Sequence, residues 1–185
     1  MSSTLEAAAA RCGAHCWVER RLFEALGVWG ASAGSPRAVV ALDRASQHAA
    51  WRAAQWLERL PVLAGVDREA LVAAPPGWAE LLGAAGSHPP ALEGAGVVAV
   101  AARVLLPRLA ERYRTHQADA TPVADRPALR TLAQCLADLR CDREDLDGAL
   151  HAALAAADGP ELAADAVLRA DRLLAARQAE SGRPG

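Results

Sequence analysis

The side chains most able to do chemistry in this sequence are a few acidic residues and one histidine at helical spacing. Glu19 follows Cys12 and Cys16 and precedes Phe23 and Leu26 at steps of three and four residues, which predicts the buried face of a helix. A carboxylate on such a face needs a metal ion, an arginine or a raised pKa, because an isolated buried charge is costly. Glu19 is therefore the first candidate for a functional site.

His48 lies in the stretch ALDRASQHAAW, residues 41–51. Apolar residues around it recur at about 100° per residue and predict one helix face, made of Leu42, Ala45, Ala49, Ala53, Trp56 and Leu60. His48 falls on the edge of that face, whereas Asp43 and Gln47 point largely away from it. An edge position suits a ligand that reaches into a helical bundle, and it equally suits a histidine in water.

Three acidic residues in the second half of the chain are further candidates. Glu111 continues a row of valines at positions 97, 100 and 104. For the last candidate two arguments disagree. Glu19 and His48 lie 17 before and 12 after Pro36, and the matching offsets around Pro127 select Glu111 and Asp138. The apolar stripe formed by Cys135, Leu139 and Leu146 selects Asp142 instead, and packing constrains the facing of a residue more tightly than an offset does.

Five helices are predicted to position these residues. Ser3–Glu6 resembles a capping box that begins a helix ending near residue 30, and Ser35 with Pro36 begins a second that ends near residue 60. A third is expected over residues 92–116 with a bend at Pro107, a fourth over 126–156 and a fifth over 159–179. Residues 62–90 carry two Pro/Gly clusters and read as a crossover with short helical turns.

The predicted class is all-α, because no segment alternates as a strand does. Two helical hairpins joined by a long crossover of about 30 residues match the ferritin-like four-helix bundle, with an additional C-terminal helix. That last helix either covers the bundle or forms a dimer contact. We expect one helical-bundle domain over residues 1–180 and a disordered tail over 181–185.

Composition limits the classes of function. Hydrophobic residues make up 52% of the 185 and aromatic residues 4%, so alanine and leucine supply most of the packing. The formal net charge of -2 does not indicate a nucleic-acid partner. The longest apolar run is too short for a membrane span and the N-terminus lacks a secretory signal, so a cytoplasmic protein with buried free thiols is expected.

A di-iron bundle of the ferritin type needs a carboxylate on each of two helices and a Glu-x-x-His on each of the other two. Here the glutamate positions of that motif, counted back from His48 and Asp138, are Ala45 and Cys135. Both bridging carboxylates are therefore missing. What remains is one ion of iron or manganese held by Glu19, His48, Glu111 and an aspartate, either Asp138 or Asp142.

Two segments carry a resemblance to a known group. Residues 17–63 contain a Trp/His-rich second helix that ends in RLP, and residues 103–144 contain a YRxH...PVxD turn. Together they resemble small actinobacterial proteins classed as ferritin-like. The resemblance implies a ferritin-like bundle, in a superfamily that includes iron oxidases, iron-dependent oxygenases and proteins that have lost the metal. Because the bridging carboxylates are missing, this chain resembles the proteins that have lost the metal, or a protein with an atypical metal site.

The turn YRTH...PVAD has two interpretations of its own. Tyr113, His116 and Asp125 form a small cluster at the end of the second hairpin, or Asp125 simply caps the following helix in a packed turn. The second interpretation is the simpler one. No GxSxG, P-loop, GxGxxG or HExxH motif supports a hydrolase, a nucleotide-binding protein or a zinc protease.

Two classes of function follow. In the first, the bundle is a non-haem, iron-type oxidoreductase with a degenerate or atypical metal site. In the second, it is a metal-free bundle that binds a partner protein or associates with itself. Homo-oligomers are expected because the Ala-rich faces of the second and fifth helices suit close packing. The feature that separates the two classes is whether Glu19 and His48 meet.

Overall fold

The computed structural model describes residues 5–62, 64–82, 94–155 and 158–181. These residues form helices and short helical turns, and no strand occurs among them, which confirms the all-α prediction. In chain order the elements are α1 (Leu5–Gly30), α2 (Pro36–Arg59), η1 (Arg68–Leu71), α3 (Trp78–Leu82), α4 (Ala95–Val100), η2 (Ala101–Leu105), α5 (Leu106–Asp119), α6 (Arg126–Ala153) and α7 (Gly159–Ser181). The predicted capping box and most of the predicted tail lie outside the described residues.

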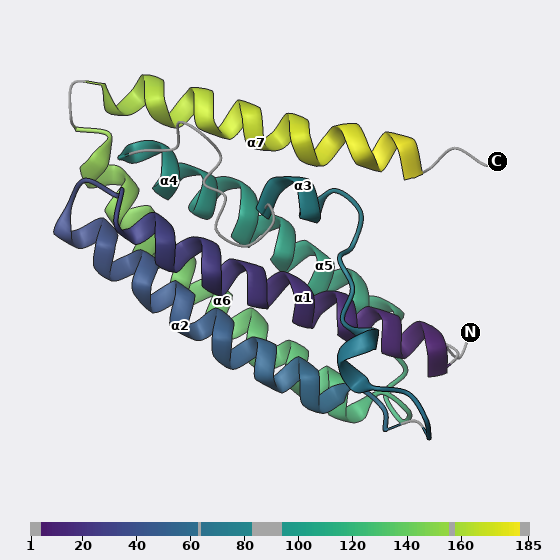
Figure 1. Ribbon diagram of the computed structural model, residues 1–185. Helices are drawn as coiled ribbons and strands as arrows, with labels where there is room; N and C mark the ends of the chain where they lie inside the picture. Colours follow the sequence, from purple (N-terminus) through teal and green to yellow (C-terminus); the bar gives the residue numbers. More distant parts are fainter. Residues whose placement is uncertain (1–4, 63, 83–93, 156–157, 182–185) are drawn as a thin grey trace.

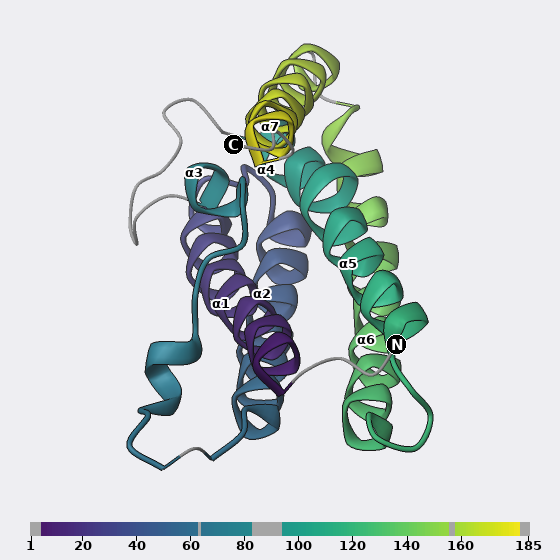
Figure 2. The same ribbon diagram turned by 90° about the vertical axis from the view of Figure 1, so that its right-hand side faces the viewer.

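Two antiparallel hairpins form the body of the molecule (Figure 1). The first consists of α1 and α2, and the second consists of the α4–η2–α5 segment and α6. Figure 2 shows the hairpins side by side, with α2 against α6 and the C-terminal helix above them. The crossover between the hairpins contains η1 and α3, the short helical turns that its composition predicts.

The first hairpin is fixed by local signals that the sequence carries. The Oγ of Ser35 accepts a hydrogen bond from the backbone N–H of Ala38 at 3.2 Å, and Pro36 fills the first turn of α2. Ser46 on α2 donates to the carbonyl of Phe23 at 2.7 Å and ties the two helices together. The predicted cap and start of this helix are confirmed.

The second hairpin contains a feature that was not predicted. The bend expected at Pro107 is a π-helical turn, η2, that ends two residues before it. Proline has no N–H to donate and its ring clashes with the carbonyl four residues earlier, so the helix widens there. A π turn adds a residue to the turn and rotates every later position. Glu111 lies beyond this turn and is exposed, whereas Val100 and Val104 are buried in a segment that α7 also covers.

The start of α6 also differs from the prediction. Asp125 stands at the N-cap position, but its side chain does not cap the helix. Its carboxylate instead accepts from the backbone N–H and the hydroxyl of Thr121, at 2.8 and 3.0 Å. The backbone of Asp125 (φ -100°, ψ 15°) lacks the extended conformation of a capping residue, which explains the different partner.

The C-terminal helix α7 packs on α4, where Ala163, Ala166 and Ala170 are buried. It therefore covers the bundle, as one of the two expectations for this helix has it, and the dimer contact stays a prediction. Self-association through α2 stays a prediction. Of the four cysteines, Cys12, Cys16 and Cys135 are buried free thiols as expected, whereas Cys141 is exposed.

One close approach between segments depends on a glycine. A Cβ atom placed on Gly13 of α1 would lie 1.9 Å from the backbone oxygen of Leu71 in η1. Only glycine leaves room for η1 at this point.

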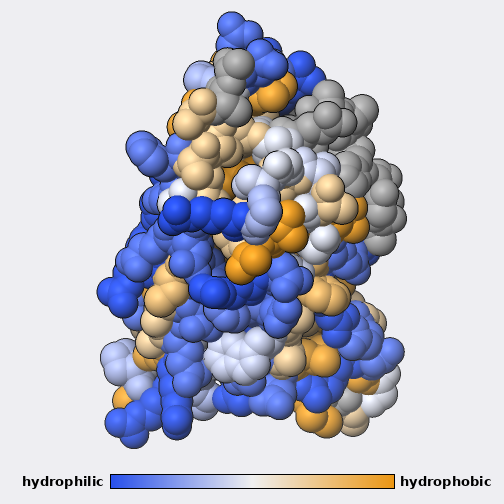
Figure 3. Space-filling model, turned by 90° about the vertical axis from the view of Figure 1, so that its left-hand side faces the viewer, coloured by the Kyte–Doolittle hydropathy of each residue, from blue (hydrophilic) through white to orange (hydrophobic). Residues whose placement is uncertain are grey.

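The surface is mixed in character. The face in Figure 3 carries hydrophilic side chains with apolar ones in small groups between them. Within the described part of the chain, no helix has the length and apolar character needed to cross a membrane.

Candidate functional site

The centre of the bundle holds an arginine between two carboxylates. Arg52 of α2 donates through Nε to Oε1 of Glu19 at 2.6 Å and through Nη1 to Oδ2 of Asp142 at 2.8 Å. Glu19 and Arg52 are 0% exposed and Asp142 is 2% exposed. Three helices, α1, α2 and α6, thus contribute one charged group each. We call these residues, with Tyr113, the buried cluster.

Tyr113 of α5 brings the fourth helix into this cluster. Its hydroxyl donates to Oε1 of Glu19 at 2.5 Å and accepts from Nε1 of Trp56 at 2.9 Å. Burial, and then the charge of Glu19, raise the pKa of Tyr113 well above its ordinary value, so the hydroxyl keeps its proton. It therefore acts as a permanent donor to Glu19.

The electrostatics of the cluster favour an ion pair. Burial by itself would lower the pKa of Arg52, but the charge and hydrogen bond of Glu19 outweigh burial and raise it. Burial raises the pKa of Glu19, while Arg52 and Tyr113 oppose that shift. Arginine stays protonated in proteins, so a fixed positive charge lies between the two carboxylates.

His48 joins the cluster from its edge. Its Nδ1 donates to Oδ1 of Asp142 at 2.6 Å, while 39% of the side chain remains exposed. The prediction of an edge position for His48 is confirmed. Glu19 and His48 do not touch each other, because Arg52 and Asp142 lie between them.

The predicted ligands are therefore only partly brought together. Glu19, Asp142 and His48 belong to one hydrogen-bonded chain through Arg52. Glu111 is an exposed residue whose carboxylate lies 3.4 Å from Arg114, and Asp138 is half-buried outside the cluster. Of Asp138 and Asp142, the residue that the apolar stripe selected, Asp142, is the one that faces the interior.

These donors do not fit a metal ion. Two hard cations, or one, would need the carboxylates of Glu19 and Asp142 to converge on the ion. Here both converge on a guanidinium group, which already neutralises their charge. Among the described residues, no group of three or more histidine, cysteine, aspartate and glutamate side chains is arranged to hold a metal.

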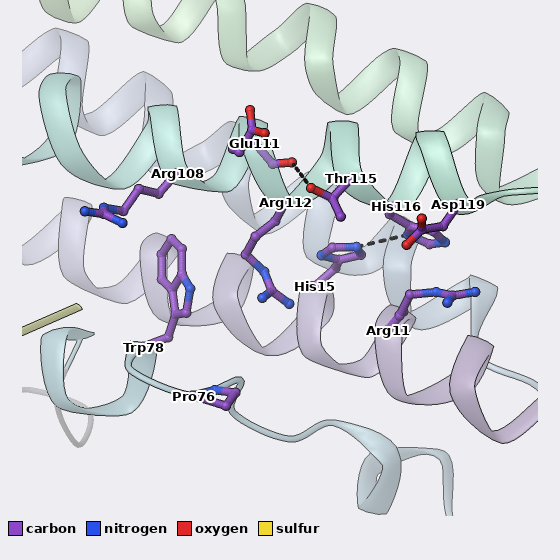
Figure 4. Close-up of a pocket in the computed structure, with 10 residues that line it drawn as sticks. All are labelled: Arg11, His15, Pro76, Trp78, Arg108, Glu111, Arg112, Thr115, His116 and Asp119. Carbon is purple, nitrogen blue, oxygen red and sulfur yellow. Dashed lines mark hydrogen bonds between the residues drawn. The ribbon is translucent and has the colours of Figure 1, made fainter. Parts of the chain in front are cut away.

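A second feature lies beside the buried cluster. A pocket of about 400 Å³ opens between α1, α5 and the segment that leads into α3 (Figure 4). We call it the α1–α5 pocket. Its lining consists of Arg11, His15, Pro76, Trp78, Arg108, Glu111, Arg112, Thr115, His116 and Asp119. Three arginines and two histidines face two carboxylates, so basic groups dominate the lining.

Two buried histidines form the floor of this pocket. Nε2 of His15 and Nδ1 of His116 share a hydrogen bond of 3.1 Å. Burial, followed by Arg112 and His116, lowers the pKa of His15 well below its ordinary value. Burial, followed by Arg11, also lowers the pKa of His116. Both imidazoles are therefore neutral near pH 7.

Aromatic rings connect the α1–α5 pocket with the buried cluster. The ring of His15 lies 4.7 Å from that of Trp56 and 4.8 Å from that of Tyr113, measured between centroids. Because Tyr113 also binds Glu19, one layer of aromatic rings separates the floor of the pocket from the charged centre.

Apart from His116, sequence reasoning missed the basic residues of both features, although their spacing is visible. Arg52 follows Ala45 and Ala49 and precedes Trp56 at steps of four, three and four, on the apolar face of α2. The pocket residues recur every four positions, as Arg11 and His15 on α1 and as Arg108, Arg112 and His116 on α5. A repeated basic residue at helical spacing is the signal that identifies this face.

Comparison with known proteins adds no relative. No protein-family model matches the chain, and neither a curated protein nor a solved structure matches it.

Proposed function

We propose that this protein is a metal-independent bundle of the ferritin-like type that works by binding a ligand. The observation that carries the proposal is the position of Arg52, whose guanidinium takes the place between Glu19 and Asp142 that a metal ion would need. The antiparallel hairpins and the long crossover support the ferritin-like part of the proposal. The α1–α5 pocket supports the binding part.

This proposal follows the metal-free class of function and does not assign a reaction. An oxidoreductase of the iron type would need open ligands at the centre of the bundle. Here each carboxylate of the centre is held by Arg52, and Glu19 is also held by Tyr113. The fixed pairs make a structural centre, and the ligand-binding surface is the neighbouring pocket.

Metal content tests the proposal directly. The protein would be purified without chelators from cells grown with added iron and manganese, and bound metal per chain would be measured by mass spectrometry. Wild type is expected to carry far less than one ion per chain, because Arg52 already neutralises the centre.

Two variants make this experiment decisive. Glu19→Ala removes a central carboxylate, and Glu111→Ala is the matched control at an exposed carboxylate. Stoichiometric metal in wild type that disappears in Glu19→Ala and persists in Glu111→Ala would overturn the proposal. Metal far below one ion per chain in all three proteins supports it.

A further inference from the structure

We propose that the α1–α5 pocket binds a small organic anion whose carboxylate or phosphate group lies between Arg11 and Arg112, with its apolar part toward Trp78. This inference names the ligand class for the binding role proposed above and rests on it. Charge, unused hydrogen-bond donors and the shape of the lining each support it.

The charge of the lining is not balanced by the protein. Arg108 is paired with Asp171 at 2.8 Å, and Glu111 is paired with Arg114. In the part of the chain that the structure describes, Arg11 and Arg112 have no ion-pair partner. The lining carboxylates, Glu111 and Asp119, are exposed. Among the described residues, neither arginine contacts a carboxylate, and Asp125, on which the charge of Arg11 acts, is already hydrogen-bonded to Thr121.

Several donors at this place are also unused. Nε and Nη2 of Arg11 and Nε of Arg112 are buried and have no hydrogen-bond partner. Burial lowers the pKa of Arg112. Leaving buried donors of a charged group without partners is costly, and an oxyanion relieves that cost because guanidinium groups match its geometry.

His15 supplies a third donor. The residue is 2% exposed, and its Nδ1 has no partner. If the hydrogen bond of the histidine pair runs from Nδ1 of His116 to Nε2 of His15, the proton of neutral His15 lies on Nδ1. That tautomer offers an N–H at the floor of the pocket, and the two arginines lie on either side of His15 in Figure 4, with Arg11 extending toward the side of Asp119. An anion selects this tautomer.

The other end of the pocket carries the apolar side chains of the lining, beside Arg108, whose charge is paired with Asp171. Trp78 and Pro76 stand on the side of Arg112 away from His116 (Figure 4). A volume of about 400 Å³ lies in the range of small-molecule sites. A metal cation is disfavoured by the arginines, so an anion with a compact apolar body is the ligand class that uses both ends.

The test is a calorimetric titration at low salt with four probes. Benzoate and phenyl phosphate carry the two candidate head groups on one ring, benzyl alcohol is the neutral match, and inorganic phosphate lacks the ring. At least one of the aromatic anions is expected to bind more tightly than benzyl alcohol and inorganic phosphate. The better of the two identifies the head group. The imidazole resonances of His15 and His116 in wild type are expected to shift in the same titration.

Variants locate the site. Arg11→Gln and Arg112→Gln are each expected to weaken binding of the preferred anion about tenfold or more, because each removes a charged hydrogen-bond donor. Arg140→Gln, an exposed arginine of α6, makes the same change in net charge and is expected to leave binding within about twofold. Circular dichroism confirms that each variant is folded.

Three results would overturn the anion site. These are aromatic anions that bind no better than benzyl alcohol, inorganic phosphate that binds as well as the better aromatic anion, and an equal loss in Arg140→Gln. The metal measurement is independent of all three. Low metal with no anion binding removes this site and leaves the argument from Arg52 standing, whereas stoichiometric metal removes the proposed function itself.

Discussion

Arg52 has no exposed surface, and both of its ion-pair partners, Glu19 and Asp142, are buried as well. Replacing Arg52 by methionine keeps much of the volume but leaves Glu19 and Asp142 as unpaired buried charges. Breaking a buried pair in this way costs about 3–5 kcal/mol. Urea unfolding followed by circular dichroism is expected to show a loss of that size in the free energy of unfolding.

Arg44 provides the matched control for this prediction. It forms an ion pair of 2.6 Å with Asp145, and both side chains are largely exposed. Arg44→Met is expected to cost less than about 1 kcal/mol. Similar losses in the two variants would contradict the central role that the structure gives to Arg52.

The histidine pair predicts a dependence of stability on pH. The pKa values of His15 and His116 are lowered in the folded protein from an ordinary value of 6.5. Below that value the unfolded chain binds protons that the folded chain does not, so stability falls as pH drops from about 6.5 toward the folded pKa. Each histidine contributes up to about 1.4 kcal/mol per pH unit in that window.

Unfolding curves measured between pH 7 and pH 5 check this expectation. A variant with His116→Gln is expected to show a shallower slope, because one of the two titrating groups is gone. Asp125 and Glu69, whose pKa values are lowered, act below about pH 4.5, whereas Glu19, whose pKa burial raises, contributes a slope of the opposite sign above that pH. The difference between wild type and His116→Gln isolates the histidine contribution, and equal slopes in the two proteins would refute the assignment.

At the scale of single residues, the sequence predicted more of the acids than of the bases. Glu19 and Asp142 were found because an apolar stripe is a reliable guide to the interior. Arg52 lies on such a stripe as well, but an arginine is usually exposed, so only the pairing across helices reveals its position. That pairing depends on tertiary contacts between α1, α2 and α6.

Among the elements, α1 depends most on a single small residue. Gly13 lets the backbone of η1 approach α1, and a methyl group there would meet the oxygen of Leu71. Helix propensity alone would make Gly13→Ala stabilising by about 1 kcal/mol. The clash is expected to reverse the sign, with a net loss of about 1–3 kcal/mol in the free energy of unfolding.

Gly30, at the end of α1, is the control, since nothing lies within 4 Å of a Cβ added there. Gly30→Ala is expected to be neutral or slightly stabilising in the same thermal or urea unfolding experiment. If both alanine variants behaved alike, the contact between η1 and α1 would not be a feature of the folded protein.

The helices themselves were predicted well because caps, prolines and apolar periods are local signals. The π turn of η2 was not, since the sequence shows where Pro107 disrupts a helix but not how the backbone adapts. A period counted through a proline therefore carries less information than one counted within an uninterrupted helix. Glu111 is exposed although the valines of its row are buried, because α7 covers α4 and η2.

At the scale of the whole molecule, the all-α class and the two hairpins follow from the order of the elements. The place of α7 and the α1–α5 pocket do not. Both are formed by segments far apart in the chain, and their alanines and arginines suit a surface as well as an interface. Only the packing of the hairpins shows which alanines are covered and which arginines converge.

The pocket and the buried cluster share two helices. On α1, His15 lines the pocket and Glu19, one turn later, belongs to the buried cluster. On α5, Arg112 lines the pocket and its neighbour Tyr113 belongs to the buried cluster. An anion that binds only the folded chain adds to its stability, by about 2.7 kcal/mol at a hundred times the dissociation constant. Such a ligand would act as a chemical chaperone, restoring folded protein to variants whose centre has been damaged.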